Sequence, residues 1–181
     1  DYRIIGNSTP RFKYGITQDA AWKGFDFSIF MQGIGKRDLW LDGCYFWGAN
    51  GQGNEWQSTG FTEHWDFFRP EGDPLGANLN SYYPRVNFSG GRNTKIQTRY
   101  LQNGAYLRLK NVQLGYTLPR VWTEKAGISS VRVYVSGDNL ATITSLSKIF
   151  DPEATGSLAG TGSGKLYPLQ RVISVGVNVN F

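Results

Sequence analysis

The chain has 181 residues and a formal net charge of +5, and it contains 23 glycines and 15% aromatic residues but only 18% charged residues. Its lysines and arginines are scattered, with no cluster longer than Lys36-Arg37, which is unlike a nucleic-acid-binding footprint. No run of about eighteen apolar residues is present, which excludes a membrane-spanning helix, and the lack of Glu/Lys/Ala-rich stretches favours an all-β fold.

The N-terminal part of the chain predicts a β-hairpin. Apolar residues alternate with other residues from Phe12 to Thr17 and again from Phe25 to Ile29, and a period of two residues is typical of a β-strand. The residues between these segments are few enough for a tight turn. We therefore predict strands at about residues 10–19 and 24–33.

A long connection follows, from about residue 35 to residue 103, and it is rich in aromatic side chains. Flat rings stack on the C–H groups of sugars without requiring charge, so these rings are candidates for contact with a substrate or with a partner that closes over it. The same rings could instead form a small core of the connection itself. The candidate contact residues are Trp40, Tyr45, Phe46, Trp47, Trp56 and Trp65.

The polar residues of this connection match no catalytic or metal-binding motif. His64 is the only histidine, and it has no cysteine or histidine partner for a zinc site or a catalytic triad. Glu63 with Asp66, and Glu71 with Asp73, offer oxygen ligands, but their spacing matches no EF-hand loop. We predict no catalytic residues, no metal site and no cofactor, with calcium as the one ion that these carboxylates could bind.

A second hairpin is predicted from strands at about residues 105–118 and 129–138. The apolar positions change parity near Lys110-Asn111, which predicts a bulge where the strand leaves the membrane. In the second of these strands, Arg132 and Tyr134 have the opposite parity to the alternating valines. If the valines face lipid, we expect Arg132 and Tyr134 to face the interior of a barrel or a domain that plugs it.

The last strand is predicted at about residues 171–181, after a second long connection at about 139–168. Ile173, the following valines and Phe181 share one face, and the opposite face carries only small uncharged residues such as Asn178. A row of lipid-facing apolar side chains in front of a water-filled interior fits this pattern. We predict that Asn178 faces the interior.

The connections alternate between short turns and long loops, which is the asymmetry of outer-membrane β-barrels, where the turns are periplasmic and the loops extracellular. This orientation also places Trp22, Trp122 and Phe181 near one membrane boundary. Five strands cannot close a barrel, because the smallest membrane barrels have about eight. We therefore expect the chain to be a piece of a longer polypeptide or to pair with strands of other chains.

Several stretches resemble the SusC/RagA-type TonB-linked outer-membrane transporters, and the resemblance extends along most of the chain. It is carried by Ile5 to Phe12, Phe25 to Gly33, Tyr106 to Pro119, Ser136 to Leu140, Asp151 to Glu153, and Tyr167 to Arg171 with the closing strand. Residues 37–103 match no motif of the family, so the identity of the substrate stays open.

The resemblance implies that the chain forms the C-terminal five antiparallel strands of a transmembrane barrel of about 22 strands. The N-terminal plug domain and the TonB box would lie outside it. It also implies import of nutrients, usually oligosaccharides and sometimes peptides, driven by the TonB complex and assisted by a SusD-like surface lipoprotein. Phe181 looks like the terminal aromatic residue that the barrel-assembly machinery recognises.

Two other interpretations compete with the transporter. A soluble carbohydrate-binding β-sandwich would use the same aromatic residues, but it would bury the valine face against a second sheet. An outer-membrane enzyme would need a pair of acid and base residues, and no such pair stands out in the sequence.

Overall fold

The computed structural model describes residues 2–50, 60–87, 91–156 and 164–181, and it divides into two compact units. The sheet unit comprises Pro10–Lys36, Ala105–Ser145 and Leu169–Phe181. The loop unit comprises the residues up to Thr9 together with Arg37–Gly104 and Leu146–Pro168. No helix among the described residues is both long enough and apolar enough to cross a membrane.

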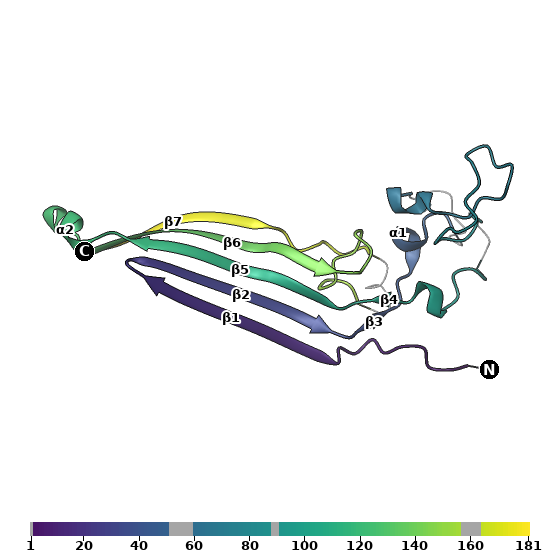
Figure 1. Cartoon of the computed structure of the whole chain (residues 1–181), viewed down its shortest axis with the longest axis horizontal. Helices are drawn as coiled ribbons and strands as arrows, with labels where there is room; N and C mark the ends of the chain where they lie inside the picture. The colour runs from purple at the N-terminus through teal and green to yellow at the C-terminus, as the bar shows by residue number, and fades with distance from the viewer. Residues whose placement is uncertain (1, 51–59, 88–90, 157–163) are drawn as a thin grey trace. The chain divides into compact units, whose positions relative to one another are not determined.

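One antiparallel sheet of five strands makes up the sheet unit (Figure 1). Its strands lie side by side in the order in which they occur along the chain. This architecture confirms the predicted all-β fold of five antiparallel strands. The strands are β1 (Phe12–Trp22), β2 (Phe25–Gly35), β5 (Tyr106–Thr117), β6 (Ser130–Thr144) and β7 (Val172–Asn180).

The two short connections of the sheet are closed by residues with a left-handed backbone. Lys23 and Gly24 have φ angles of 47° and 89°, and two successive positive φ angles are the mark of a type I′ hairpin turn. The connection from β5 to β6 contains a helical turn, α2 (Arg120–Thr123), and a 3-10 turn, η4 (Glu124–Ala126). Gly127 ends it with a φ of 71°, where a side chain would be strained.

The predicted bulge is present, but the sheet continues on both sides of it. Asn111 pairs with Asp138 and Leu109 pairs with Ala141, so two residues of β6 face the single Lys110 of β5. β6 therefore runs to Thr144 instead of ending at about residue 138. Asn139 adopts a left-handed backbone with a φ of 52°, which Asn tolerates better than most residues. Such a residue is common in turns, but here it forms a bulge inside β6.

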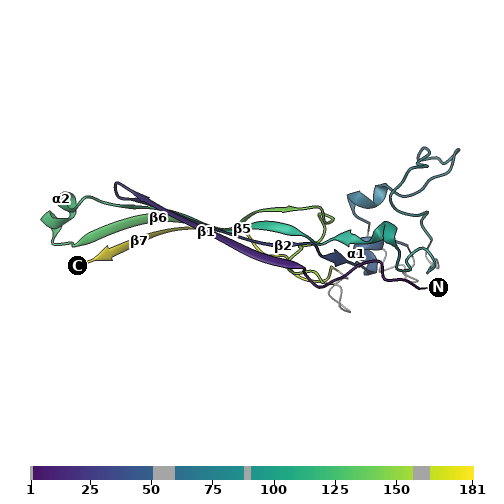
Figure 2. The same cartoon turned by 60° about the horizontal axis from the view of Figure 1, so that its bottom comes forward.

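The pairing register places nearly all the large apolar residues of the five strands on one face, which we call the apolar face. On β7 and β6, for example, Val177 lies opposite Val133 and Val175 opposite Val135, and directly paired residues share a face. Val175 and Val177 are 77% and 58% exposed, and Figure 2 shows the strands in one twisted layer. Within the sheet unit, no second layer covers the apolar face.

The loop unit consists of the two long connections and has little regular structure. It contains a short ladder of β3 (Asp38–Leu39) with β4 (Gln102–Asn103), and one helical turn, α1 (Gly43–Trp47). Two 3-10 turns, η2 (Thr62–Trp65) and η3 (Thr98–Tyr100), complete its regular elements among the described residues.

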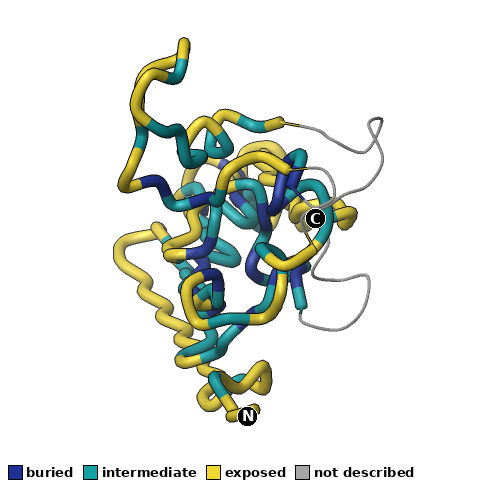
Figure 3. The backbone as a smooth tube through the Cα atoms, turned by 90° about the vertical axis from the view of Figure 1, so that its right-hand side faces the viewer, coloured by how far each residue is buried: buried dark blue, intermediate teal, exposed yellow. Residues whose placement is uncertain are grey.

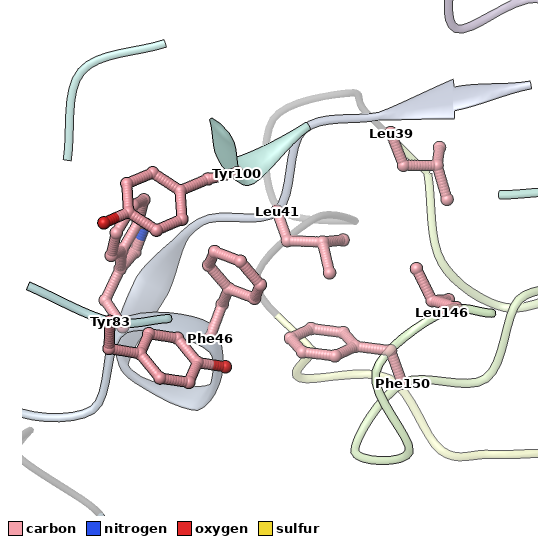
Figure 4. Close-up of a cluster of buried hydrophobic side chains, with 8 residues drawn as sticks. Leu39, Leu41, Phe46, Tyr83, Tyr100, Leu146 and Phe150 are labelled. Carbon is pink, nitrogen blue, oxygen red and sulfur yellow. The ribbon is translucent and has the colours of Figure 1, made fainter. Parts of the chain in front are cut away.

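A hydrophobic core of its own holds the loop unit together. Figure 3 marks its buried residues in dark blue, and Figure 4 shows their side chains pointing toward one another. Both long connections contribute to this core, because Leu146 and Phe150 follow β6 whereas the other members follow β2. The core residues are Leu39, Leu41, Phe46, Trp47, Tyr83, Tyr100, Leu146 and Phe150.

Candidate functional site: the polar sheet face and the aromatic loop unit

The face of the sheet opposite the apolar face, which we call the polar face, carries a charged network. The Arg132 guanidinium forms two hydrogen bonds with the Asp26 carboxylate, and the one from Nε to Oδ1 measures 2.9 Å. The Gln113 amide, with its oxygen turned toward the guanidinium, accepts a further bond of 2.6 Å from Nη2. The Arg132 guanidinium also lies 5.1 Å from the centre of the Tyr134 ring.

The three residues predicted to face the interior lie on this polar face. Arg132 is paired with Asn178, and Tyr134 is paired with Gly176, so all three belong to the same side of β6 and β7. The sequence interpretation missed Asp26. Its parity in β2 is opposite to that of Phe25 and Phe27, and a carboxylate at such a position inside a strand is the signal that could have identified it.

Further polar pairs continue along the same face. The Arg108 side chain, which is only 4% exposed, donates from Nε to Thr142 Oγ1 at 2.8 Å. Asn111 Nδ2 donates to Asp138 Oδ1, also at 2.8 Å. Neighbouring strands are thus joined by their side chains as well as by their backbones, on a face suited to contact with water or with a polar domain.

The ring side chains predicted near a membrane boundary occur at one end of the sheet. Trp22 ends β1 beside the hairpin turn and is 69% exposed, and Trp122 lies in α2 and is 65% exposed. Phe181 follows β7 directly and is 90% exposed. Figure 1 shows α2, the β1–β2 turn and the C-terminus at the same end of the sheet.

The structure separates the candidate contact rings of the loop unit into buried and exposed groups. Phe46 and Trp47 are 1% and 2% exposed, so they are core residues and offer almost no surface to a ligand. Trp40 packs against that core, 6.0 Å from Trp47 between ring centres. Tyr45 is half-buried and lines a pocket described below. Trp56 lies outside the described residues.

Among the candidate rings that the structure describes, Trp65 is the exposed one, with 60% of its surface accessible. Its ring stacks on Phe67 with centres 6.4 Å apart, and the Arg69 guanidinium lies 4.8 Å from the centre of the Phe67 ring. Arg69 also donates from Nη1 to the Trp65 carbonyl at 2.9 Å, which holds the three residues together. Trp65 and Phe67 line a pocket of about 470 Å³ that His64 also borders.

His64 organises the turn η2, although no motif in the sequence singles it out. Its Nδ1 accepts a hydrogen bond from the Phe61 N–H at 3.0 Å, so Nε2 carries the proton and donates to the Phe46 carbonyl at 3.1 Å. Burial lowers the pKa of His64 below its usual value. Gly48 lies against the ring with a φ of 59°, and a side chain there would crowd Nδ1.

A second pocket, of about 690 Å³, lies in the loop unit and is lined by residues of both long connections. Tyr45 and Phe61 come from the first connection, with ring centres 5.5 Å apart, whereas Ile149 and Leu166 come from the second. Lys148 is the cationic residue among the described residues that line this mostly apolar cavity. We call this cavity the Lys148 pocket.

Asp66 and Asp73, two of the carboxylates considered as calcium ligands, accept hydrogen bonds from the protein. Asp66 accepts one bond from Asn78 Nδ2 and another from the Tyr82 N–H, both at 3.0 Å. Asp73 accepts a bond of 2.9 Å from the Leu75 N–H. Within the described residues, no group of three or more His, Cys, Asp or Glu side chains is arranged to hold a metal ion.

Comparison with known proteins identifies the family. TonB-dependent receptor P3 of Formosa agariphila is 32% identical to this chain over 191 residues, which cover all of the chain and 17% of the receptor. TonB-dependent receptor P26 of the same organism is 28% identical, with all of the chain and 18% of the receptor covered. No protein-family model matches the chain.

Solved structures agree with these relatives. The RagAB peptide importer in its open-open state matches 99% of this chain and 18% of its own chain, with 27% identity and a TM-score of 0.74. The closed-closed state of the importer gives a TM-score of 0.73. The chain spans less than a fifth of the length of these relatives. It belongs to the TonB-dependent receptors, as a segment of the SusC/RagA type.

Proposed function

We propose that this chain is part of a bacterial outer-membrane transporter that imports nutrients with energy delivered by TonB. The observation that carries the proposal is the single-layer sheet with one exposed apolar face and one hydrogen-bonded polar face, in a chain of the TonB-dependent receptors. An apolar face of this extent on one layer of strands suits contact with lipid, because apolar surface is stable there without a covering layer.

In the proposed transporter, the five strands are the last of a barrel of about 22. The outer strands β1 and β7 pair with other strands of the barrel, since unpaired backbone groups in lipid cost several kcal/mol each. Phe181 serves as the barrel-assembly signal. Arg132, Tyr134 and Asn178 face the interior, where the plug domain packs against them.

The two long connections are extracellular in this arrangement, and a SusD-like lipoprotein covers them. The similarity of the chain to the RagAB peptide importer supports such a partner. The TonB complex acts through the N-terminal part of the protein. The proposed protein is a transporter and not an enzyme, in keeping with relatives that are named receptors or importers.

Two classes of cargo are considered, oligosaccharides and peptides. Exposed Trp65, stacked on Phe67, supports an oligosaccharide, because a sugar ring can stack on an accessible indole. The burial of Phe46 and Trp47 weakens that argument, and the similarity to the RagAB peptide importer supports a peptide. We favour a peptide and retain an oligosaccharide as the second candidate.

The β-sandwich alternative requires a second sheet over the apolar face. Apart from the five-stranded sheet and two isolated bridges, the β-structure of the described residues is the ladder of two-residue strands β3 and β4. Neither strand of that ladder is long enough to cover a face of eleven-residue strands such as β1 and β2. We therefore do not favour a soluble carbohydrate-binding module.

An uptake experiment tests the proposal. The full-length gene is expressed in a Gram-negative host with and without functional TonB, and the uptake of fluorescent oligopeptides and of fluorescent oligosaccharides is measured. We expect uptake of one class that requires both the gene and TonB. Absence of TonB-dependent uptake of either class, from a protein shown to be folded in the outer membrane, would contradict the proposal.

A further inference from the structure

We propose that the Lys148 pocket binds the C-terminal residue of a peptide, with its apolar side chain against the pocket wall and its carboxylate at the Lys148 ammonium group. This inference rests on the proposed function and adds a binding site to it. A cavity of about 690 Å³ is of the size that accepts a small ligand. Its lining combines aromatic and aliphatic side chains with one cation.

The pocket is preformed, because the two connections that build it are fixed to each other. Glu63 of the first connection accepts hydrogen bonds from Ser147 Oγ at 2.7 Å and from the Lys148 N–H at 3.1 Å, both in the second connection. These two bonds engage both oxygens of the Glu63 carboxylate. They also fix the backbone that carries Lys148, so the ligand need not order it.

Gly164 brings the second connection close to the first. Its φ is 77°, and a Cβ at this position would lie 2.7 Å from Cε1 of Phe150 and 3.1 Å from Cβ of Tyr45. A side chain would therefore push the two segments apart. Glycine permits the close approach that places Leu166 and Tyr45 on the wall of the same cavity.

Charge indicates which end of a peptide fits. Glu63 provides the one carboxylate among the described lining residues, and its oxygens already accept bonds from the protein. Among the described residues, the Lys148 ammonium has no carboxylate partner within ion-pair distance. A ligand carboxylate would provide one. The apolar walls formed by Phe61, Ile149 and Leu166 favour an apolar terminal side chain over the hydroxyl groups of a sugar acid.

The test measures binding to the full-length transporter in detergent by calorimetry, with the peptide Ala-Ala-Gly-Leu as the free acid and as the C-terminal amide. We expect the free acid to bind about tenfold more tightly than the amide, because a charge-assisted hydrogen bond to Lys148 contributes about that factor in affinity. The K148M variant should bind the acid as weakly as the amide and leave the affinity for the amide unchanged. Lys95, an exposed lysine of the same unit that does not line the pocket, provides the matched control K95M, which should behave as the wild type.

Three results would overturn the inference. Equal affinity for acid and amide in the wild type, including no measurable binding of either, would exclude carboxylate recognition. An equal loss for both ligands in K148M would show a general disturbance of the pocket. Lys148-dependent binding of tetragalacturonic acid without binding of the peptide acid would show that the site takes acidic sugars.

Uptake measurements separate the failure of this site from failure of the proposed function. Uptake of the peptide by the wild type that is unchanged in K148M would reject the site and preserve peptide import. Absence of TonB-dependent uptake of any nutrient would reject the proposed function itself.

Discussion

Arg132 on β6 and Asp26 on β2 form an ion pair that reaches across the intervening strand β5. The pair passes over Gly115, which lies directly opposite Asp26 in the register. A Cβ at position 115 would lie 2.5 Å from Arg132 Nη2 and from Asp26 Oδ1. The absence of a side chain on β5 is therefore what allows strands on either side of it to be joined by their charges.

We predict that Gly115→Ala displaces this ion pair and destabilises the barrel by about 1–3 kcal/mol, as overpacking commonly does. The measurement is the temperature at which the full-length protein loses its folded electrophoretic mobility in detergent. Gly35→Ala is the control, because a Cβ at Gly35 would lie 3.6 Å from its nearest neighbour, an ordinary contact. Equal melting temperatures for the two variants would show that the close passage over Gly115 is unimportant.

A second prediction concerns the bonds of Glu63 to the connection that follows β6. Glu63→Ala removes the acceptors for Ser147 Oγ and for the Lys148 N–H, and a hydrogen bond to a charged group contributes about 1.5–3 kcal/mol. We expect faster amide exchange in peptides that cover residues 146–150 of the full-length protein, measured by mass spectrometry. Glu71→Ala, a change to an exposed acid of the same unit, should leave this exchange unchanged. Equal exchange in both variants would contradict a structural role for Glu63.

The third prediction follows from the lowered pKa of His64. In the unfolded state, His64 has its ordinary pKa of about 6.5. The folded turn resists protonation of the ring, because the ring is buried and Nδ1 already accepts a hydrogen bond from the Phe61 N–H. Stability is therefore fully present above about pH 6.5 and declines as the pH falls toward the folded-state pKa.

Amide exchange of peptides covering residues 61–67 measures this decline. After correction for the intrinsic effect of pH on exchange, we expect protection in the wild type to fall as the pH is lowered below about 6.5. His64→Gln, which cannot titrate, should show a flat profile over the same range. A decline of equal size in the variant would assign the pH dependence to another group.

The sequence predicted the sheet well because each strand carries its pattern locally. Alternation with a period of two identifies β1, β2 and β7 without knowledge of their partners, and the change in parity locates the bulge at Lys110. The ion pair between Asp26 and Arg132 was not predicted, because it joins residues 106 positions apart and depends on the strand order.

The loop unit was less accessible to prediction for the same reason. Whether a ring in a connection is buried depends on partners distant in sequence, such as Phe150 against Phe46, whose ring centres lie 6.3 Å apart. Phe46, Trp47 and Trp65 are all large aromatic residues of one irregular connection, yet two of them form the core and one is exposed. Pattern within a connection does not determine which ring reaches the surface.

This difference between Trp47 and Trp65 gives the last prediction. Trp47 is 2% exposed and packs edge-on against Tyr100 with ring centres 4.7 Å apart, so Trp47→Ala should destabilise the loop unit by about 3–5 kcal/mol. Trp65→Ala removes an exposed ring whose stacking on Phe67 contributes about 0.5–1.5 kcal/mol, so it should destabilise the loop unit far less than Trp47→Ala. Amide exchange of the loop unit in the full-length protein measures both effects.

Uptake then indicates whether Trp65 contacts the cargo. An oligosaccharide that stacks on this indole should be taken up less efficiently by Trp65→Ala, although the loop unit keeps most of its exchange protection. Trp47→Ala should reduce protection and uptake together, because it loosens the unit on which any loop contact depends. Normal oligosaccharide uptake by Trp65→Ala would show that the exposed Trp65 ring does not bind a sugar cargo. Phe46 and Trp47 could not replace it, because both are buried.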